Sequence, residues 1–421
     1  MSNHSRATSE QPTALTPKAN MIWNATGSIL NLGCQWLITI LIVRLSDGFT
    51  AAGLYSLASS IYTMFAPLGQ YRMNVYQVSD VKRENTLGEY LSFRLITSYT
   101  ALALCAAYAI ITCKPTEVLA VILYGLYKTV TLLIEVCHAC DQQNYRMDYV
   151  GQSLALQGIG SLIAFCSVFV LTSALEPALI AMTAVVALIG ITLDLPRSRR
   201  FEPINLGISL SKVKSLLIKC LPIVIAGIAT SAAPSLPRQM LANILGTSSL
   251  GIYASIAAPI AIIQMGATYI YNPLLRYFSD SFNDNDIPSF IRLLKKTVLG
   301  IAAVGVAATV GILLFAKPII SLLYGTKMAD YAYLMIPMVP FALLTGLTWF
   351  MSDLLTAIRN FRGTFIGGVF SLAVAVIAMR PLITHFGMNG VTYTGIVSCI
   401  GSLALMSTFL IANLRLKCNH V

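Results

Sequence analysis

Arg238 is a permanently charged side chain inside a stretch that is apolar enough to cross a membrane. The stretch covers residues 216–245, and Pro234 and Pro237 stand just before the arginine. A charge in the hydrocarbon core costs at least ~2.5 kcal/mol, and such residues usually face a cavity or a pathway. Two prolines in one turn remove helix hydrogen bonds, which predicts a local break of the helix. We therefore expect Arg238 to line a solute cavity, with a structural ion pair to a neighbouring helix as the alternative.

Further polar side chains fall within apolar segments, and their types suit a substrate site. Those expected to line the same cavity as Arg238 are Arg72, Gln264, Gln77, Gln35 and Asn31. Guanidinium and amide groups donate hydrogen bonds to phosphate and hydroxyl oxygens. These residues form the candidate substrate-binding set, and no catalytic or metal-binding set is expected beside them.

Two acids and a lysine form a second group, whose members could change charge. Glu135 and Asp353 stand nine and seven residues before an Asn-aromatic-Arg triplet in each half of the chain, so they occupy similar places. Ionisable residues within membrane spans are often proton relays or ion sites. They are therefore candidates for coupling to H⁺ or Na⁺. Lys128 lies seven residues before Glu135 on the same helix face, so a plain ion pair between these two is the alternative.

The chain that carries these residues has the composition of a polytopic membrane protein. Of its 421 residues 56% are hydrophobic and 11% are charged, whereas a typical soluble domain has about 25% charged residues. Apolar segments near the ~20 residues that a spanning helix needs recur along the chain. There are twelve of them, at residues 21–43, 52–78, 91–112, 118–138, 150–172, 174–195, 216–245, 249–278, 291–316, 331–357, 363–383 and 389–414. We expect an all-α fold of twelve transmembrane helices.

The distribution of Lys and Arg predicts the orientation of the chain. With the amino terminus inside, nineteen of the 28 fall in cytoplasmic segments, five on the outer side and four within spans. Because cytoplasmic loops are enriched in basic residues, we expect a multi-pass protein of the cell membrane with both termini in the cytoplasm. The net charge of +11 reflects this bias and is no argument for nucleic acid binding. Arg94, at a cytoplasmic helix end, is expected to reach Asp80 or Glu84.

The two halves of the chain carry an internal repeat. Gly53-Leu54-Tyr55 opens the second segment, and Gly251-Ile252-Tyr253 opens the eighth, 198 residues later. Four further matches follow in the same order: Asp80 with Asp280, Lys114-Pro115 with Lys317-Pro318, Tyr124-Gly125 with Tyr324-Gly325, and Asn144-Tyr145-Arg146 with Asn360-Phe361-Arg362. Six spans, an even number, separate the copies, so the two halves share one orientation. This predicts two six-helix lobes related by an axis along the membrane normal, with a cavity between them.

The repeat and the basic residues together predict the divisions of the chain. They are a disordered cytoplasmic tail (1–20), an amino-terminal six-helix lobe (21–195), a basic cytoplasmic linker (196–215), a carboxy-terminal six-helix lobe (216–414) and a short cytoplasmic tail (415–421). The polar first residues lead directly into a full-length span, so no cleavable signal peptide is expected.

Several short motifs resemble those of the Wzx-type polysaccharide flippases. In the first half they are Ile42-Val43-Arg44-Leu45-Ser46, Gly53-Leu54-Tyr55-Ser56 and Tyr76-Gln77-Val78-Ser79-Asp80. In the second half they are Pro237-Arg238, Leu245-Gly246, Leu250-Gly251-Ile252-Tyr253-Ala254, Tyr324-Gly325 and Gly387-Met388-Asn389-Gly390-Val391. The resemblance extends from about residue 20 to residue 415 and rests on short, permissive motifs.

This resemblance implies membership of the multidrug/oligosaccharidyl-lipid/polysaccharide (MOP) superfamily and a MATE-like fold. It implies a transporter, not an enzyme, that flips an undecaprenyl-pyrophosphate-linked oligosaccharide by alternating access, for O-antigen or another surface polysaccharide. Arg238 would bind the pyrophosphate. The expected partners are membrane lipid, the lipid-linked glycan and other polysaccharide-assembly proteins, the chain is expected to be a monomer, and no cofactor is expected. The segments carry fewer cations than a flippase of an anionic glycan would need, so the charge of the glycan stays open.

Other functions fit the residues less well. A multidrug/ion antiporter of the same fold would depend on acids in the first lobe, and the first segment has none. A membrane glycosyltransferase or polymerase would need a sizeable outer loop, and no G-x-x-x-x-G-K motif for direct ATP use is present. The cluster Cys137-His138-Ala139-Cys140-Asp141 lacks a second ligand pair, which argues against a metal site. The other cysteines lie mostly in apolar segments and predict no disulfide framework.

Overall fold

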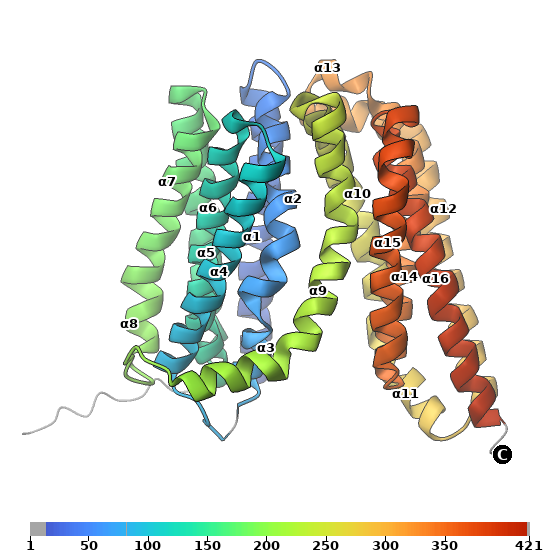
Figure 1. The fold of residues 1–421 in the computed structure, drawn as a ribbon, viewed down its shortest axis with the longest axis horizontal. Coiled ribbons are helices and arrows are strands. Elements are labelled where there is room, and N and C mark those ends of the chain that lie inside the picture. Colours follow the sequence, from blue (N-terminus) through green and yellow to red (C-terminus); the bar gives the residue numbers. More distant parts are fainter. Residues whose placement is uncertain (1–13, 81, 419–421) are drawn as a thin grey trace, which may run out of the picture. The chain divides into compact units, whose positions relative to one another are not determined.

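A computed structural model describes residues 14–80 and 82–418 of the chain, and these residues form helices and no strand (Figure 1). Residues 1–13 and 419–421, the outer parts of the two predicted tails, lie outside the described residues. The helices of the first half are α1 (Pro17–Leu45), α2 (Thr50–Gln70), α3 (Met73–Val78), α4 (Leu87–Thr112), α5 (Pro115–Gln143), α6 (Met147–Thr172), α7 (Leu175–Ile189), the π-helical η1 (Gly190–Asp194) and α8 (Leu195–Ser198). Those of the second half are α9 (Leu210–Leu245), α10 (Thr247–Tyr271), α11 (Leu275–Asn283), α12 (Ile287–Tyr324), α13 (Thr326–Ala329), α14 (Met335–Ala357), α15 (Phe361–Phe386) and α16 (Asn389–Cys418), with the short 3₁₀ turns η2 (Asn272–Leu274) and η3 (Ala332–Leu334).

The twelve predicted apolar segments fall almost entirely on helical residues, eight of them within one helix, and the segments 52–78, 174–195, 249–278 and 331–357 each contain more than one helical element. Ten spans among the described residues are long and apolar enough to cross a membrane. The two other segments correspond to α2 and α10, the second helix of each half, and α2 is rich in Ser and Thr. The chain is therefore a multi-pass membrane protein. Its predicted division into two six-helix lobes and its orientation stay predictions.

The helices group into two compact units. The first unit contains residues up to Ile38 together with Phe65–Val224, and the second contains Thr39–Met64 together with residues from Ile225 onward. In the first unit α4 packs on α5 and α6 packs on α7, and in the second unit α15 packs on α16 and α14 on α10 (Figure 1). Exposed apolar side chains such as Leu171, Ile111 and Leu322 cover the outer faces of these helices, as expected for surfaces that contact lipid.

The core of the second unit is aromatic. Phe278 lies against Phe290 with ring centroids 5.2 Å apart and against Phe350 at 5.6 Å. Tyr271 packs on Phe350 at 5.3 Å. These rings join α10, α11, α12 and α14 and fix the helices that carry the site described below.

The two glycines that open the repeat lie face to face. A methyl carbon at Gly53 would lie 1.7 Å from the carbonyl oxygen of Thr247, and one at Gly251 would lie 2.2 Å from that of Phe49. In both cases the oxygen belongs to the residue four positions before the other glycine. A two-fold axis between repeated segments generates this kind of reciprocal contact. The contact agrees with the repeat that the sequence predicts.

The second predicted segment, residues 52–78, is divided. The helix α2 ends at Gln70, and Tyr71 and Arg72 take left-handed backbone angles with φ of 46° and 56° before α3 begins. Pro67 lies within the last turn of α2. The last carbonyl groups of this helix have no donor within the helix itself. Arg72 therefore stands exposed at a junction between two helices and is not inside a continuous span.

The predicted break at Pro234 and Pro237 is wrong, because α9 is helical from Leu210 to Leu245. Each proline removes one N–H donor, while the hydrogen bonds on either side can still form. The remaining local effect is that the carbonyl groups of Thr230 and Ala233 lose their helix donor, because the residues four positions later are prolines.

Arg94 is buried in the first unit, and its partners there differ from those that the sequence predicts. Its guanidinium lies 3.2 Å from the Glu135 carboxylate and donates to the carbonyl oxygens of Gly69, at 3.2 Å, and Gln70. It does not pair with Asp80 or Glu84. A cation that reaches the unpaired carbonyls at the end of α2 is favoured by the helix dipole, and it joins α2 to α4 and α5.

Candidate functional site

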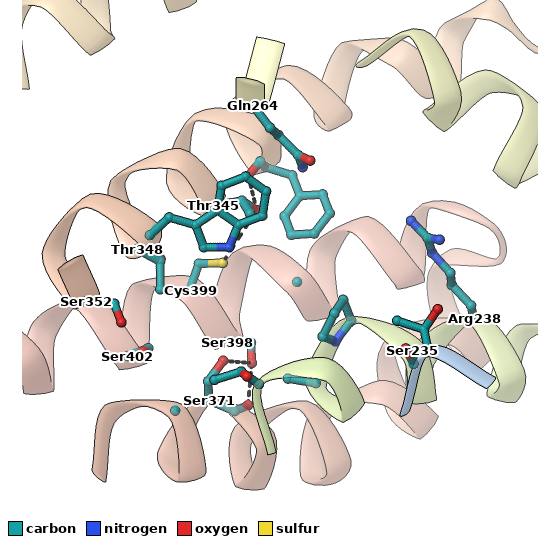
Figure 2. A pocket seen from close by; sticks show the side chains of 18 of the residues that line it. Ser235, Arg238, Gln264, Thr345, Thr348, Ser352, Ser371, Ser398, Cys399 and Ser402 are labelled. Carbon is teal, nitrogen blue, oxygen red and sulfur yellow. Dashed lines mark hydrogen bonds between the residues drawn. The ribbon is translucent and has the colours of Figure 1, made fainter. Parts of the chain in front are cut away.

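A cavity of about 330 Å³ lies in the second unit, enclosed by α2, α9, α10, α14, α15 and α16 (Figure 2). Most of its surface is apolar, and its polar part comes mainly from the hydroxyl groups of Ser59, Ser60, Thr63, Thr230, Ser235, Thr345, Thr348, Ser352, Ser371, Ser398 and Ser402. Phe341 and Trp349 add aromatic rings, and Gln264 adds an amide. Among the described residues of this lining there is one charged side chain, Arg238.

Arg238 enters the cavity from α9, near Ser235 and across from Ser352 and Ser402 (Figure 2). Its side chain is half-buried. Within the described chain no carboxylate lies within 4.0 Å of its guanidinium, so the alternative of a structural ion pair finds no partner there. A guanidinium cannot lose its proton at physiological pH, and its fork of N–H groups matches phosphate oxygens. The site therefore holds a fixed positive charge that is available to an anion.

The hydroxyls come from a pattern that the sequence analysis missed. Thr345, Thr348 and Ser352 are spaced three and four residues apart on α14, and Ser398 and Ser402 are four apart on α16. Residues at these spacings share one helix face. A polar stripe of this kind on an otherwise apolar helix was the signal available in the sequence.

The predicted substrate-binding residues fall into two groups. Arg238 and Gln264 line the same cavity in the second unit. Gln77, Gln35 and Asn31 lie in the first unit, as does Arg72. Gln77 is buried and donates to the carbonyl oxygen of Val136 at 3.1 Å, and Gln35 donates to the hydroxyl of Tyr127 at 2.9 Å. The backbone of Asn31 packs against Gly158, where a methyl carbon would lie 2.8 Å from the Asn31 Cα. The role of these four residues in binding stays a prediction.

The three coupling candidates have defined partners. Glu135 accepts a hydrogen bond from the Asn74 amide at 3.1 Å in addition to its pair with Arg94. Lys128 lies 5.0 Å from the centre of the Tyr127 ring and 5.6 Å from that of Tyr124, so the predicted alternative of a Lys128–Glu135 ion pair is wrong.

Asp353, on α14, accepts a hydrogen bond from the hydroxyl of Tyr271 at 2.9 Å. It follows Ser352, which lines the cavity, so the acid lies beside the site without belonging to its lining. Of the three coupling candidates, Asp353 is the nearest in sequence to a residue that lines the cavity.

A buried polar network in the first unit was also missed. His138 Nε2 lies 3.0 Å from Ser153 Oγ, which donates to Asp194 at 2.8 Å and accepts from Gln157 at 2.8 Å. These side chains join α5, α6 and the π-helical turn η1. His138 belongs to the Cys137–Asp141 motif, which occupies the last turns of α5. The partners of His138 are a serine and a carboxylate, and the described residues contain no cluster of metal-ligating side chains.

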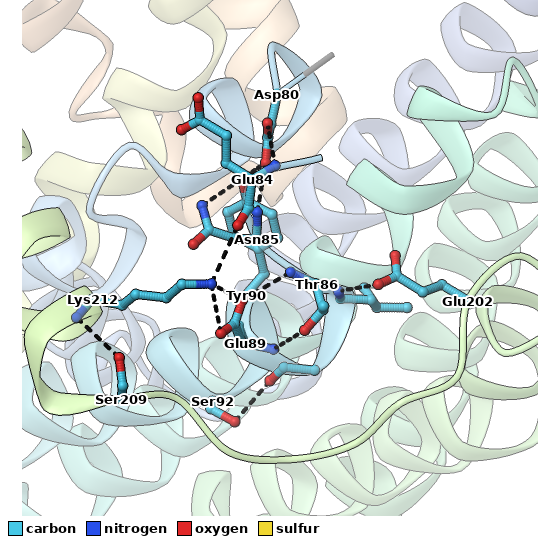
Figure 3. A network of polar contacts seen from close by, with 12 residues as sticks. Asp80, Glu84, Asn85, Thr86, Glu89, Tyr90, Ser92, Glu202, Ser209 and Lys212 are labelled. Atoms are coloured by element: carbon cyan, nitrogen blue, oxygen red, sulfur yellow. Dashed lines mark hydrogen bonds and ion pairs between the residues drawn. The ribbon is translucent and has the colours of Figure 1, made fainter. Parts of the chain in front are cut away.

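A second polar network caps the start of α4 (Figure 3). Asp80 accepts from the N–H of Glu84 at 2.9 Å, from the N–H of Asn85 at 3.1 Å and from the Tyr90 hydroxyl at 2.7 Å. Burial by itself raises the pKa of Asp80, but these hydrogen bonds outweigh it and lower the pKa below its usual value. Lys212 at the start of α9 adds an ion pair with Glu89 at 2.7 Å. These contacts tie Asp80 and the start of α9 to the beginning of α4.

Comparisons with known proteins agree with this architecture. No known family profile matches the chain. The capsular polysaccharide biosynthesis protein CapF of Staphylococcus aureus is 23% identical over 314 residues, which cover 74% of this chain and 78% of that protein.

Solved structures show the fold. The lipid II flippase MurJ, in an inward closed conformation, aligns with a TM-score of 0.72 at 11% identity over 95% of this chain and 90% of that one. An inward-facing MATE multidrug resistance transporter of the MOP superfamily aligns with a TM-score of 0.58 at 16% identity over 93% and 98%. A Vibrio cholerae MATE transporter aligns at 0.59 and 11% identity over 96% of each chain. The predicted all-α, MATE-like fold is confirmed.

Proposed function

We propose that this chain is a flippase that moves an undecaprenyl-pyrophosphate-linked oligosaccharide across the cytoplasmic membrane by alternating access, for the assembly of a surface polysaccharide. The observation that carries the proposal is the Arg238 guanidinium, which has no described carboxylate partner and faces a cavity lined by hydroxyls within a helical membrane protein. The likeness in fold to a lipid II flippase, and in sequence to a capsular polysaccharide protein, supports it.

The chemistry of the cavity suits the two parts of such a headgroup. The pyrophosphate carries negative charge, and Arg238 offers it paired N–H donors that a water-poor site strengthens. The glycan carries hydroxyls, and the lining offers matching oxygens. The polyprenyl chain can stay in lipid during transport, because only the polar headgroup needs a path through the protein.

The finer features belong to the proposal. The chain acts as a monomer with two six-helix lobes (21–195 and 216–414) joined by the basic linker. Both of its termini lie in the cytoplasm. It works together with other polysaccharide-assembly proteins. It needs no cofactor. An H⁺ or Na⁺ gradient drives the cycle through Glu135 or Asp353, since an acid within a membrane span that changes charge shifts the balance between two conformations. Glu135→Gln and Asp353→Asn should each lose gradient-dependent flipping, and full gradient dependence in both would exclude this coupling.

Substitution of Arg238 tests the function. Arg238→Gln should abolish export of the surface glycan while the protein stays at normal abundance in the membrane, because the amide cannot neutralise pyrophosphate. Arg238→Lys should restore part of the export, since it returns the charge without the forked geometry. Abundance is measured beside export. Low abundance of the Gln variant would point to a structural role, and normal export at normal abundance would remove Arg238 from the substrate site.

A multidrug antiporter is the second candidate, because MATE transporters share the fold. The described α1 carries no Asp or Glu, which removes one place where a proton-driven pump of this fold could hold its coupling acid. Drug efflux that depends on Arg238, without any effect on surface glycan, would favour this second function over the first.

A further inference from the structure

Most of the hydroxyls that line the cavity donate their proton to a partner within the protein. Of the eleven that line it, eight donate their single proton to a backbone carbonyl oxygen: Ser60, Thr63, Thr230, Ser235, Thr345, Thr348, Ser398 and Ser402. A hydroxyl has one proton and two lone pairs. Once the proton is used within the protein, the oxygen can only accept a hydrogen bond from a ligand. Most of the hydroxyls in the lining therefore present acceptors to a ligand.

The prolines of α9 add acceptors of a second kind. Pro234 and Pro237 supply no N–H to the carbonyl groups of Thr230 and Ala233, four residues before them. Thr230 and Ala233 both line the cavity. These carbonyl groups lack their usual helix donor and belong to residues of the cavity wall, which adds to its capacity to accept hydrogen bonds.

The donors of the lining are confined to particular places. Arg238 is its cation, Gln264 carries an amide, Trp349 carries an indole N–H and Ser352 a hydroxyl with no described hydrogen bond, and the described lining contains no Lys, His, Asp or Glu. Figure 2 shows Arg238 apart from Ser352, Ser402 and Ser371. An anion therefore has one charged partner, and a second anion placed against the hydroxyls of α9 or α16 would meet mainly oxygen lone pairs.

We infer that the cavity selects an uncharged sugar, rich in hydroxyl or acetamido donors, at the position next to the pyrophosphate, and rejects an acidic sugar there. The inference rests on the proposed function, which places the pyrophosphate at Arg238. A carboxylate only accepts hydrogen bonds and finds few donors in this lining, so it would lose more hydration than it regains, whereas sugar O–H and amide N–H groups find many acceptors. The volume of about 330 Å³ is at the small end of the ~300–1,000 Å³ of ligand pockets, which suits the first sugar and not a whole oligosaccharide.

The binding of matched lipids tests this inference. The probes are a short polyprenyl diphosphate carrying N-acetylglucosamine, the same lipid carrying glucuronic acid, and the sugar-free polyprenyl diphosphate. The chain has three tryptophans, of which Trp349 lines the cavity, so the full-length W23F/W36F protein in nanodiscs reports binding by Trp349 fluorescence. We expect the acetamido sugar to bind at least about tenfold more tightly than the acidic sugar, because a buried acceptor without a donor is costly.

A cation added to the hydroxyl wall should reverse the preference. Ser352 is a suitable position, because its side chain carries no described hydrogen bond that the substitution would remove. Ser352→Lys should bring the acidic sugar to within about threefold of the neutral one. Thr356→Lys, one turn further along α14 and outside the lining, is the control with the same added charge and should keep the preference of the parent protein.

The outcomes separate this inference from the proposed function. Equal binding of the two sugars, or tighter binding of the acidic one, with binding still lost in Arg238→Gln would overturn the inference and leave the flippase proposal standing. Failure of all three polyprenyl diphosphates to bind, or binding that does not depend on Arg238, would overturn the proposed function itself.

Discussion

The close approach of Gly53 and Gly251 makes a sharp stability prediction. A methyl group at Gly53 would lie 1.7 Å from the Thr247 oxygen and 2.5 Å from its carbonyl carbon, so no rotation of a side chain can relieve the clash. Ordinary carbon contacts are ~3.5–4.0 Å, and α2 and α10 would have to separate locally by close to 2 Å. Overpacking of this kind costs typically ~1–3 kcal/mol or more. We expect Gly53→Ala to lower the free energy of unfolding by at least about 2 kcal/mol.

The same geometry predicts how two substitutions combine. In Gly53→Ala the helices have already moved apart, so Gly251→Ala added to it meets a contact that is already open. The double variant should therefore lose less stability than the two single losses together, as for residues in direct contact. Gly311→Ala on α12 is the control, because nothing lies within 4 Å of a methyl carbon there. It should gain up to ~1 kcal/mol from helix propensity.

The assay is thermal unfolding of the purified protein in detergent, followed by size-exclusion chromatography of the fraction that remains monodisperse. The parent protein, Gly311→Ala, both single glycine variants and the double variant are compared under one set of conditions. If Gly53→Ala is as stable as Gly311→Ala, or if the two losses simply add, then the reciprocal glycine contact between α2 and α10 does not exist in the folded protein.

Three further predictions concern the first unit and the topology. Arg94→Met should destabilise the protein by roughly 1–3 kcal/mol, because it leaves Glu135 without its cation and the carbonyl groups at the end of α2 without a donor. Lys128→Met, which removes contacts with Tyr124 and Tyr127, should cost less in the same unfolding assay, and equal losses would contradict the assigned pairing. The lowered pKa of Asp80 means that its contribution to stability is fully present above the unfolded pKa of ~3.9 and is lost as pH falls through the lower folded value. Asp80→Asn should therefore lower the midpoint of thermal unfolding at neutral pH and reduce its decline in acid, and an unchanged acid profile would count against the network around α4. A reporter fused after Val421 should indicate the cytoplasm, and a signal from the opposite side would mean that the number of spans is not even.

Much of the fold was readable from the sequence, because a membrane-spanning helix is specified locally. About 20 apolar residues in a row are enough to span the bilayer and to bury their own backbone hydrogen bonds. All twelve segments coincide with helices for this reason. Arg238 stood out on the same grounds, because a charge in such a segment is costly wherever its partners lie.

The candidate site was readable only in part. A serine or threonine in a membrane helix can bond to its own backbone or to a neighbouring helix, so its type reveals neither its partner nor its direction. The hydroxyls of α14 and α16 became a site only when packing turned them toward the same cavity as Arg238 and Gln264. Arg94 met Glu135, and Lys128 met two tyrosine rings, for the same reason.

The sequence by itself determined the class of the protein, the places of its apolar helical segments, its internal repeat and the unusual arginine. Only the tertiary structure decided which side chains meet: the pairing of Gly53 with Gly251, the partners of Arg94 and Lys128, the grouping of residues 39–64 with the second half, and the acceptor-rich lining around Arg238. The length of an apolar stretch is a property of consecutive residues, so it can be read directly from the sequence. A contact between helices depends on shape and spacing at positions that can lie a hundred or more residues apart, and packing selects among partners that the sequence leaves equivalent.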